Sequence, residues 1–184
     1  MFTGIIEAKV EVIERGNGIL KISRPPIYKD LAYGQSIAIN GACLTLARFD
    51  EDFLEFDVLD ETFAKTNLGE SKIANTERAL KADGRFEGHV VQGHVDGVIK
   101  FLRKDGERHY FSKPEGFDQF FVYKGSISLN GVSLTIAEDL DDQFCVALIP
   151  HTLELSNLGD LEPEDGINFE CDIFAKLLYK WQKK

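Results

Sequence analysis

Reactive side chains occupy matched positions in two parts of this chain. Cys43 lies in the segment INGACLTL, and Ser133 lies at the same place in LNGVSLTI. A thiol and a hydroxyl can add to an electrophile or take part in proton transfer. His94 and Asp172 could supply an imidazole and a carboxylate for general acid–base catalysis. These residues are far apart in the sequence, so their chemistry depends on the elements that position them.

An internal repeat relates the two segments. Residues 36–46 and 126–136 are identical at six of eleven positions, at a constant offset of 90. The same offset, with three residues inserted late in the second copy, pairs Thr62 with Thr152, 75–77 with 168–170, and 1–5 with 91–95. Two copies are too few for a solenoid, so the repeat predicts a duplicated domain.

Each copy carries the alternation of apolar and polar residues that is typical of β-strands. In the first copy, KVEVIE and ILKIS flank the turn sequence Gly16-Asn17-Gly18, and SIAIN, CLTLARF and FLEFDVL follow. The second copy repeats the pattern with VDGVIKFL, HYFSK, SISLN, SLTIAEDL and FCVALI. Short strands separated by turns predict a small closed barrel in each copy.

Helical patterns are few. Short helical turns are expected over 26–31 and 115–122, and an amphipathic helix is expected over 173–182. The apolar face of this last helix could pack on its own barrel or mediate oligomerisation.

The composition limits the partners of the chain. Its 184 residues suit one domain or two small ones, and its net charge of −10 argues against nucleic acid or an anionic membrane as a partner. No apolar run approaches the roughly 18 residues of a membrane span. The first residues, MFTGIIEAKVEVIERG, lack the basic and apolar regions of a secretory signal. We therefore expect a cytoplasmic protein.

The spacing of cysteines and histidines argues against a metal centre. Cys43, Cys145 and Cys171 form no CxxC pair, and His89 and His94 are five residues apart. The usual nucleotide-binding and hydrolase motifs are also absent from the sequence.

Residues kept in both copies suggest scaffold positions and ligand contacts. Asn40-Gly41 and Asn130-Gly131 are predicted to form turns that need a positive φ. Two threonine pairs are either simple strand formers or hydroxyls that face a polar ligand: Thr45 with Thr135, and Thr62 with Thr152.

Residues that differ between the copies indicate two cavities whose polar groups have diverged. The alignment pairs Gly4 with His94, Gly34 with Lys124, Cys43 with Ser133, Glu61 with His151 and, after the insertion, Ala79 with Asp172.

Together these motifs resemble riboflavin synthase of the α-chain type. MFTGIIE, INGACLTL, TNLG, GHVVQGHVDG, KGSISLNGVSLTI and LIPHTLE follow the order and spacing of that family, from Met1 to about Asp172. The resemblance implies an all-β chain of two tandem six-stranded Greek-key barrels plus a C-terminal α-helix. The expected domains are residues 1–88, 89–172 and 173–184, the last serving oligomerisation.

The family implies a dismutation of 6,7-dimethyl-8-ribityllumazine. One molecule gives a four-carbon unit to a second, which yields riboflavin and 5-amino-6-ribitylamino-uracil without a metal or redox cofactor. The family also implies a homotrimer, in which the first barrel of one subunit meets the second barrel of a neighbour. Association with lumazine synthase is left open.

The resemblance also implies the ligand contacts. In the first pocket they would be Gly4, Ile5, Ile6, Cys43, Leu44, Thr45, Asp57, Val58, Leu59, Asp60, Glu61 and Thr62. In the second they would be Gly93, His94, Val95, Lys124, Ser133, Leu134, Thr135, Leu148, Ile149, Pro150, His151, Thr152 and Leu153.

Five residues correspond to functionally sensitive positions of the family, namely Phe2, Cys43, His94, Ser133 and Asp172. Because the C7 methyl group of the substrate must lose a proton, Ser133 polarised by Asp172 is expected to assist that transfer or to activate a water that adds at C7. His94 and Cys43 would transfer protons or position the substrate, and Thr45 and Thr135 would bind the pyrimidine-like edge or the ribityl chain.

Two other classes of protein remain as alternatives. One is a non-catalytic lumazine- or flavin-binding protein of the same fold, and the other is a barrel module of a flavin-dependent reductase. The second would need a nucleotide-binding domain, for which this sequence has no room.

Overall fold

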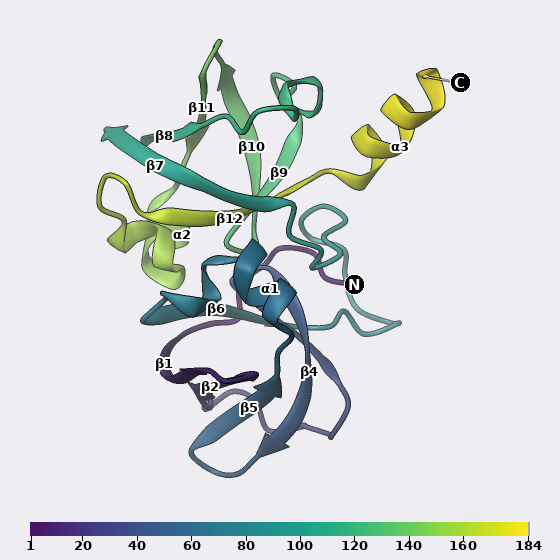
Figure 1. Ribbon diagram of the computed structural model, residues 1–184, viewed down its shortest axis with the longest axis vertical. Coiled ribbons are helices and arrows are strands. Elements are labelled where there is room, and N and C mark those ends of the chain that lie inside the picture. The colour runs from purple at the N-terminus through teal and green to yellow at the C-terminus, as the bar shows by residue number, and fades with distance from the viewer. Residues whose placement is uncertain (184) are drawn as a thin grey trace.

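The structure, a computed structural model, describes residues 1–183 and contains two closed barrels of six antiparallel strands each. This confirms the predicted all-β class and the tandem arrangement, which Figure 1 shows as one barrel above the other. In the first barrel the strands follow the closed order β1-β2-β5-β4-β3-β6. Their bounds are β1 Ala8–Gly16, β2 Ile19–Ser23, β3 Ser36–Ile39, β4 Ala42–Phe49, β5 Phe53–Asp57 and β6 Ile73–Arg78.

The second barrel repeats this plan. Its closed order is β10-β11-β8-β7-β12-β9, so each strand has the neighbours of its counterpart in the first barrel. The bounds are β7 Gly97–Asp105, β8 Arg108–Ser112, β9 Ser126–Leu129, β10 Val132–Asp139, β11 Gln143–Ala147 and β12 Gly166–Cys171.

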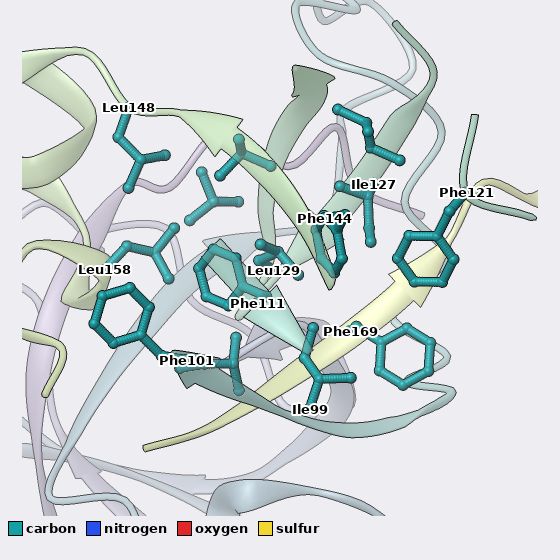
Figure 2. Packing of buried hydrophobic residues seen from close by; sticks show 14 of the residues in the cluster. Ile99, Phe101, Phe111, Phe121, Ile127, Leu129, Phe144, Leu148, Leu158 and Phe169 are labelled. Atoms are coloured by element: carbon teal, nitrogen blue, oxygen red, sulfur yellow. The ribbon is translucent and has the colours of Figure 1, made fainter. Parts of the chain in front are cut away.

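Each barrel encloses its own hydrophobic core. In the second barrel, aromatic rings from several strands fill the interior, where Phe111 stacks on Phe144 with ring centroids 5.6 Å apart (Figure 2). The first barrel is filled by aliphatic side chains, Phe56 and the buried ring of Tyr28, whose hydroxyl donates to Thr76 Oγ1 at 2.9 Å. Two separate cores mean that each repeat buries its own apolar strand faces.

The helices match the sequence only in part. α3, Ile173–Gln182, has the predicted bounds, whereas residues 26–31 form no helix and 115–122 contain only the 3-10 helix η2, Asp118–Phe120. Residues 26–27 form a turn and the rest of this segment is irregular, because burial of Tyr28 in the first core overrides the weak helical pattern. Four short helices were not predicted from the sequence: α1 Asp60–Lys65, η1 Asn67–Gly69, α2 Pro150–Leu155 and η3 Asn157–Asp160.

Helix α3 extends away from the second barrel (Figure 1). Its apolar face is open, because Leu177, Leu178 and Trp181 are 55%, 61% and 78% exposed. Its contacts with the barrel include Tyr179 against Phe120 and an ion pair between Lys176 and Asp96. The interpretation that the apolar face packs on its own barrel is therefore wrong. No helix among residues 1–183 is long and apolar enough to cross a membrane.

Four buried asparagines join the two barrels. Within each barrel one amide closes a turn, because Asn40 Oδ1 accepts from the Asn75 backbone N–H and Asn130 Oδ1 accepts from that of Asn168, at 2.8 and 2.9 Å. Across the interface, Asn75 Nδ2 donates to the Asn130 carbonyl at 2.9 Å and Asn168 Nδ2 donates to the Asn40 carbonyl at 2.8 Å. The two sets of contacts are related by a pseudo-twofold axis.

A third asparagine of each repeat, Asn67 or Asn157, adds to this network. Asn157 donates its backbone N–H to Asn75 Oδ1 at 2.7 Å, and Asn67 donates its own to Asn168 Oδ1 at 2.6 Å. Asn67 and Asn157 begin the 3-10 helices η1 and η3, so the network also fixes the segments that follow α1 and α2.

The predicted turns lie at the centre of the interface. Asn40 and Asn130 have φ values of 44° and 45°, and Gly41 and Gly131 have values of 80° and 83°, which confirms the expected positive φ. A Cβ on Gly41 would lie 2.8 Å from the Gly131 backbone nitrogen. Only glycine permits the two turns to approach so closely.

We expect Asn75→Ala to destabilise the whole chain. The substitution leaves the buried Asn157 N–H and Asn130 carbonyl without their partners, which costs about 3 kcal/mol. Urea unfolding measures this loss, with the exposed amide variant Gln182→Ala as the control within about 0.5 kcal/mol of wild type. Equal stability of the two variants would contradict a structural role for the network.

Candidate functional site

The segment that precedes each barrel crosses to the other barrel. Gly4 and Gly93 have φ values of 78° and 81°, and each accepts a backbone hydrogen bond from the opposite repeat. Ser133 N donates to the Gly4 carbonyl at 2.7 Å, and Cys43 N donates to the Gly93 carbonyl at 2.9 Å. Each reactive residue is therefore held by a segment from the other copy.

This geometry corrects the alignment of the repeat at its amino end. Gly4 is the counterpart of Gly93, an offset of 89, and Ile5 is the counterpart of His94. The additional residue of the second copy lies between β8 and β9, where 13 residues replace the 12 between β2 and β3. The offset of 90 applies only after that point.

The same contacts correct the expected grouping into pockets. Gly4 lies against Ser133 and not against Cys43, because a Cβ on Gly4 would be 2.6 Å from the Ser133 Cβ. Gly93 lies against Cys43, where its Cβ would be 2.5 Å from the Cys43 Cβ. The segments 4–6 and 93–95 thus exchange places between the two expected pockets.

The segments that precede β1 and β7 are called the crossing segments, and they include residues 2–6 and 91–95. They meet in a short two-stranded bridge. Phe2 and Val91 exchange backbone hydrogen bonds, with N···O distances of 2.7 and 3.1 Å. Phe2 has no exposed surface and packs with Val91, Ala38 and Cys43. The ring therefore packs beside Cys43 without an exposed surface of its own, and the expected functional role of Phe2 stays a prediction.

A cavity of about 230 Å³ opens beside Cys43. Cys43 is half-buried, and His94 and Val95 reach the same cavity from the crossing segment. The other lining residues come from β4, from α1 and the residue that follows it, and from Gly93: Ala42, Glu61, Thr62, Lys65, Thr66 and Gly93. The cavity therefore places a thiol, an imidazole and a hydroxyl together.

The matching position of the second barrel pairs Ser133 with a histidine. Ser133 Oγ lies 2.7 Å from His89 Nδ1. Burial lowers the pKa of His89, and the negative charge of Asp172 partly opposes this shift. The ring is therefore neutral at neutral pH, and in the tautomer whose Nδ1 is unprotonated it can accept a hydrogen bond from the Ser133 hydroxyl.

Asp172 acts on this pair from a distance. Its carboxylate caps helix α3 by accepting from Phe174 N at 2.8 Å, and no hydrogen bond joins it to Ser133 within the part of the chain that the structure describes. The expected direct Ser133–Asp172 pair is thus absent, and Asp172 influences His89 through its charge. His89 was not among the predicted site residues, although its place in GHVVQGH, the segment that also contains His94, is a sequence signal for such a role.

The remaining predicted ligand residues differ in exposure. Leu44, Val58 and Leu148 are buried in the barrel cores, where they shape the pockets from behind. The half-buried group is Ile6, Leu134, Thr152 and Leu153. The exposed group is Ile5, Thr45, Asp57, Leu59, Asp60, Lys124, Thr135, Ile149, Pro150 and His151.

A larger cavity of about 570 Å³ lies beside β6. Its lining includes Ile5, Glu77, Arg78 and Lys81 but neither Cys43 nor Ser133. We place the chemical site at the smaller cavity and at Ser133, because reactive groups converge there.

Comparison with known proteins agrees with this duplicated architecture. The lumazine binding domain family matches residues 3–79 and 92–172, once for each barrel. The crystal structure of LumP complexed with riboflavin superposes with a TM-score of 0.82 and 26% identity, covering 93% of this chain and 99% of that one. LumP complexed with 6,7-dimethyl-8-(1'-D-ribityl) lumazine, at 24% identity and a TM-score of 0.80, shows the same fold over 92% of this chain and 98% of that one. These matches define a protein of the lumazine binding domain family, with two repeats of that domain.

Sequence relatives narrow the assignment. Riboflavin synthase of Bacillus subtilis is 38% identical over 100% of this chain and 91% of its own length. The riboflavin synthases of Actinobacillus pleuropneumoniae and Escherichia coli are 36% and 34% identical, covering 100% and 94% of this chain and 91% and 87% of their own. The chain belongs to the riboflavin synthase family, a family of enzymes.

Gly4→Ala tests the crossing contact at Ser133. Gly4 and Gly34 have φ values of 78° and 81°, but only Gly4 has a neighbour, since nothing lies within 4 Å of a Cβ on Gly34. We expect Gly4→Ala to lower the free energy of unfolding by about 2 kcal/mol more than Gly34→Ala, because overpacking adds to the backbone strain. Equal losses in urea unfolding would contradict the close approach.

Proposed function

We propose that this protein converts two molecules of 6,7-dimethyl-8-ribityllumazine into riboflavin and 5-amino-6-ribitylamino-uracil. The observation that carries the proposal is the pair of equivalent sites with different polar groups, in a chain related over its full length to riboflavin synthases. Two identical molecules with different roles, a donor and an acceptor of four carbons, require two similar but unequal sites. Holding them in the reacting orientation can supply about 7–11 kcal/mol of the barrier.

In this proposal Ser133 and His89 form the proton-transfer pair. The Ser133 hydroxyl donates to the neutral His89 ring, which makes its oxygen a better acceptor for the C7 methyl proton or for a water that adds at C7. Asp172 stabilises the imidazolium that forms, through its charge.

The first cavity would hold the second substrate molecule. Cys43, His94 and Thr62 line this cavity and would orient the ring or transfer protons. Thr45 and Thr135 are exposed, and in this proposal their hydroxyls bind the pyrimidine-like edge or the ribityl chain of the substrate. The proposed chemistry needs no metal or redox cofactor.

The proposed assembly is a cytoplasmic homotrimer in which neighbouring subunits bring unlike barrels together. Support comes from exposed apolar groups beside the sites, where Leu59 and Ile149 are 75% and 62% exposed, and from the open face of α3. The proposed domain bounds are 1–88, 89–172 and 173–184, and the first residues of each barrel domain reach the other barrel. Association with lumazine synthase is a further proposal, for which sedimentation of a mixture is the test.

The central experiment mixes the protein with 6,7-dimethyl-8-ribityllumazine, without metal or nicotinamide, and follows riboflavin absorbance. We expect turnover by the wild type and a loss of about a hundredfold or more in Ser133→Ala and His89→Gln, because each removes one half of the proton-transfer pair. Asp172→Ala should lose less, since it acts through His89. Ser112→Ala, on β8 of the same barrel, is the control that keeps the wild-type rate.

Other outcomes of that assay separate the alternatives. Wild-type rates with tight ligand binding in both Ser133→Ala and Asp172→Ala would remove these residues from the mechanism. Binding without conversion by the unmodified protein would favour a carrier such as a lumazine- or flavin-binding protein. Absence of binding would defeat both interpretations.

The helix makes the oligomer testable. Replacing Leu177 and Trp181 by serine removes apolar surface that α3 would bury between subunits. We therefore expect the trimer to dissociate into single chains. Sedimentation equilibrium measures the mass, and Lys180→Ser on the same helix is the control. A wild-type monomer, or a trimer that survives the double substitution, would exclude assembly through this face.

A further inference from the structure

Two buried glutamates occupy equivalent positions in the barrels. Glu77 on β6 and Glu170 on β12 are 5% and 3% exposed, and the alignment pairs them after the three-residue insertion. Neither forms a salt bridge within residues 1–183. A buried carboxylate without a cation needs several hydrogen bonds to balance its lost hydration.

Glu77 binds the crossing segment that leads to Ser133. Its Oε1 accepts from the Thr3 backbone N–H at 2.8 Å and from the Thr3 hydroxyl at 3.2 Å, and its Oε2 accepts from the Gly4 N–H at 3.0 Å. The carbonyls of the same two residues bind the site. Thr3 O accepts from His89 N at 3.1 Å, and Gly4 O accepts from Ser133 N at 2.7 Å. One carboxylate of the first barrel thus holds the backbone that positions both members of the Ser133–His89 pair.

Glu170 binds the other crossing segment in the same way. Its Oε1 accepts from Gln92 N at 2.7 Å, and its Oε2 accepts from Gly93 N and His94 N at 2.9 and 2.8 Å. The Gly93 carbonyl accepts from Cys43 N, and His94 lines the cavity beside Cys43. A carboxylate of the second barrel therefore holds the wall of the first pocket.

The donor pattern requires a carboxylate. Both oxygens of each glutamate accept from backbone N–H groups, whereas a glutamine would turn an NH₂ group towards one of those donors. Burial raises the pKa of Glu77 to about 7 and also raises that of Glu170, while the backbone donors act in the opposite direction. The protein keeps an ionisable group at a place where the burial of an apolar residue would cost less free energy.

We propose that Glu77 and Glu170 are positioning residues that act crosswise, each on the pocket of the barrel to which it does not belong. Glu77, in the first barrel, sets the position of Ser133 and His89; Glu170, in the second barrel, sets the position of Cys43 and His94. The consequence for catalysis rests on the proposed function, but the crosswise geometry does not.

The test compares Glu77→Gln with Glu170→Gln, each serving as the control for the other. Amide ¹H–¹⁵N resonances of Ser133 and Cys43 report the two pockets in the ligand-free protein, so this readout needs no activity. We expect Glu77→Gln to shift the Ser133 resonance and leave Cys43 unchanged, and Glu170→Gln to do the reverse. The alkylation rate of the half-buried Cys43 should change only in Glu170→Gln, while the buried Cys145 and Cys171 stay unreactive.

Activity provides a second, separable readout. If the protein is a riboflavin synthase, both variants should lose up to about a hundredfold in kcat, as expected when reacting groups are misplaced by about 1 Å. Glu77→Asp and Glu170→Asp keep the charge and should recover part of that rate. A protein without dismutase activity that still shows crosswise resonance shifts would refute the proposed function and leave the positioning role intact.

Several results would overturn the crosswise role. They are shifts confined to the barrel that carries the substitution, equal shifts at Ser133 and Cys43 in both variants, or no shift at either residue. Unfolding of both the glutamine and the aspartate variants would assign these glutamates to global stability and would also overturn the proposal.

Discussion

The structure depends on the contact between two identical turns, Asn40-Gly41 and Asn130-Gly131. The backbones touch because neither glycine carries a Cβ, and asparagine side chains donate to the Asn40 and Asn130 carbonyls that this contact removes from water. This arrangement leaves little freedom in the relative orientation of the barrels, since amides accept few geometries. The pockets are formed by segments from both barrels, so their shape depends on that orientation.

From this contact follows the exchange of the crossing segments. Once the turns are paired about a pseudo-twofold axis, the chain ahead of each barrel passes the opposite barrel and pairs through Phe2 and Val91. Gly4 and Gly93 then meet Ser133 and Cys43. The reactive residues are the divergent part of an otherwise symmetric frame, with a hydroxyl beside a half-buried imidazole on one side and a thiol beside an exposed imidazole on the other.

Much of this could be predicted from the sequence. Alternation of apolar residues located ten of the strands, Asn-Gly located the turns, and i, i+4 spacing located α3, because these patterns depend on local geometry. The one-residue error at Gly4 arose because the compensating residue lies in an irregular loop, where side-chain similarity is weak. His89 and the two glutamates were missed because their partners, the Ser133 hydroxyl and backbone N–H groups, lie about 40 to 80 residues away, and no spacing rule connects such positions.

The reciprocal exchange of segments is also the pattern of a symmetric dimer, in which residue i of one chain contacts j of the other and j contacts i. A single-barrel ancestor could have formed the same contacts between two chains, each lending its first residues to its partner. In such a dimer a useful change at one wall would appear in both pockets at once. Joining the copies into one chain removes this restriction, so that Ile5 and His94 can differ although they occupy the same place in the repeat. Gene fusion would then be the step that allowed one pocket to become a donor site and the other an acceptor site.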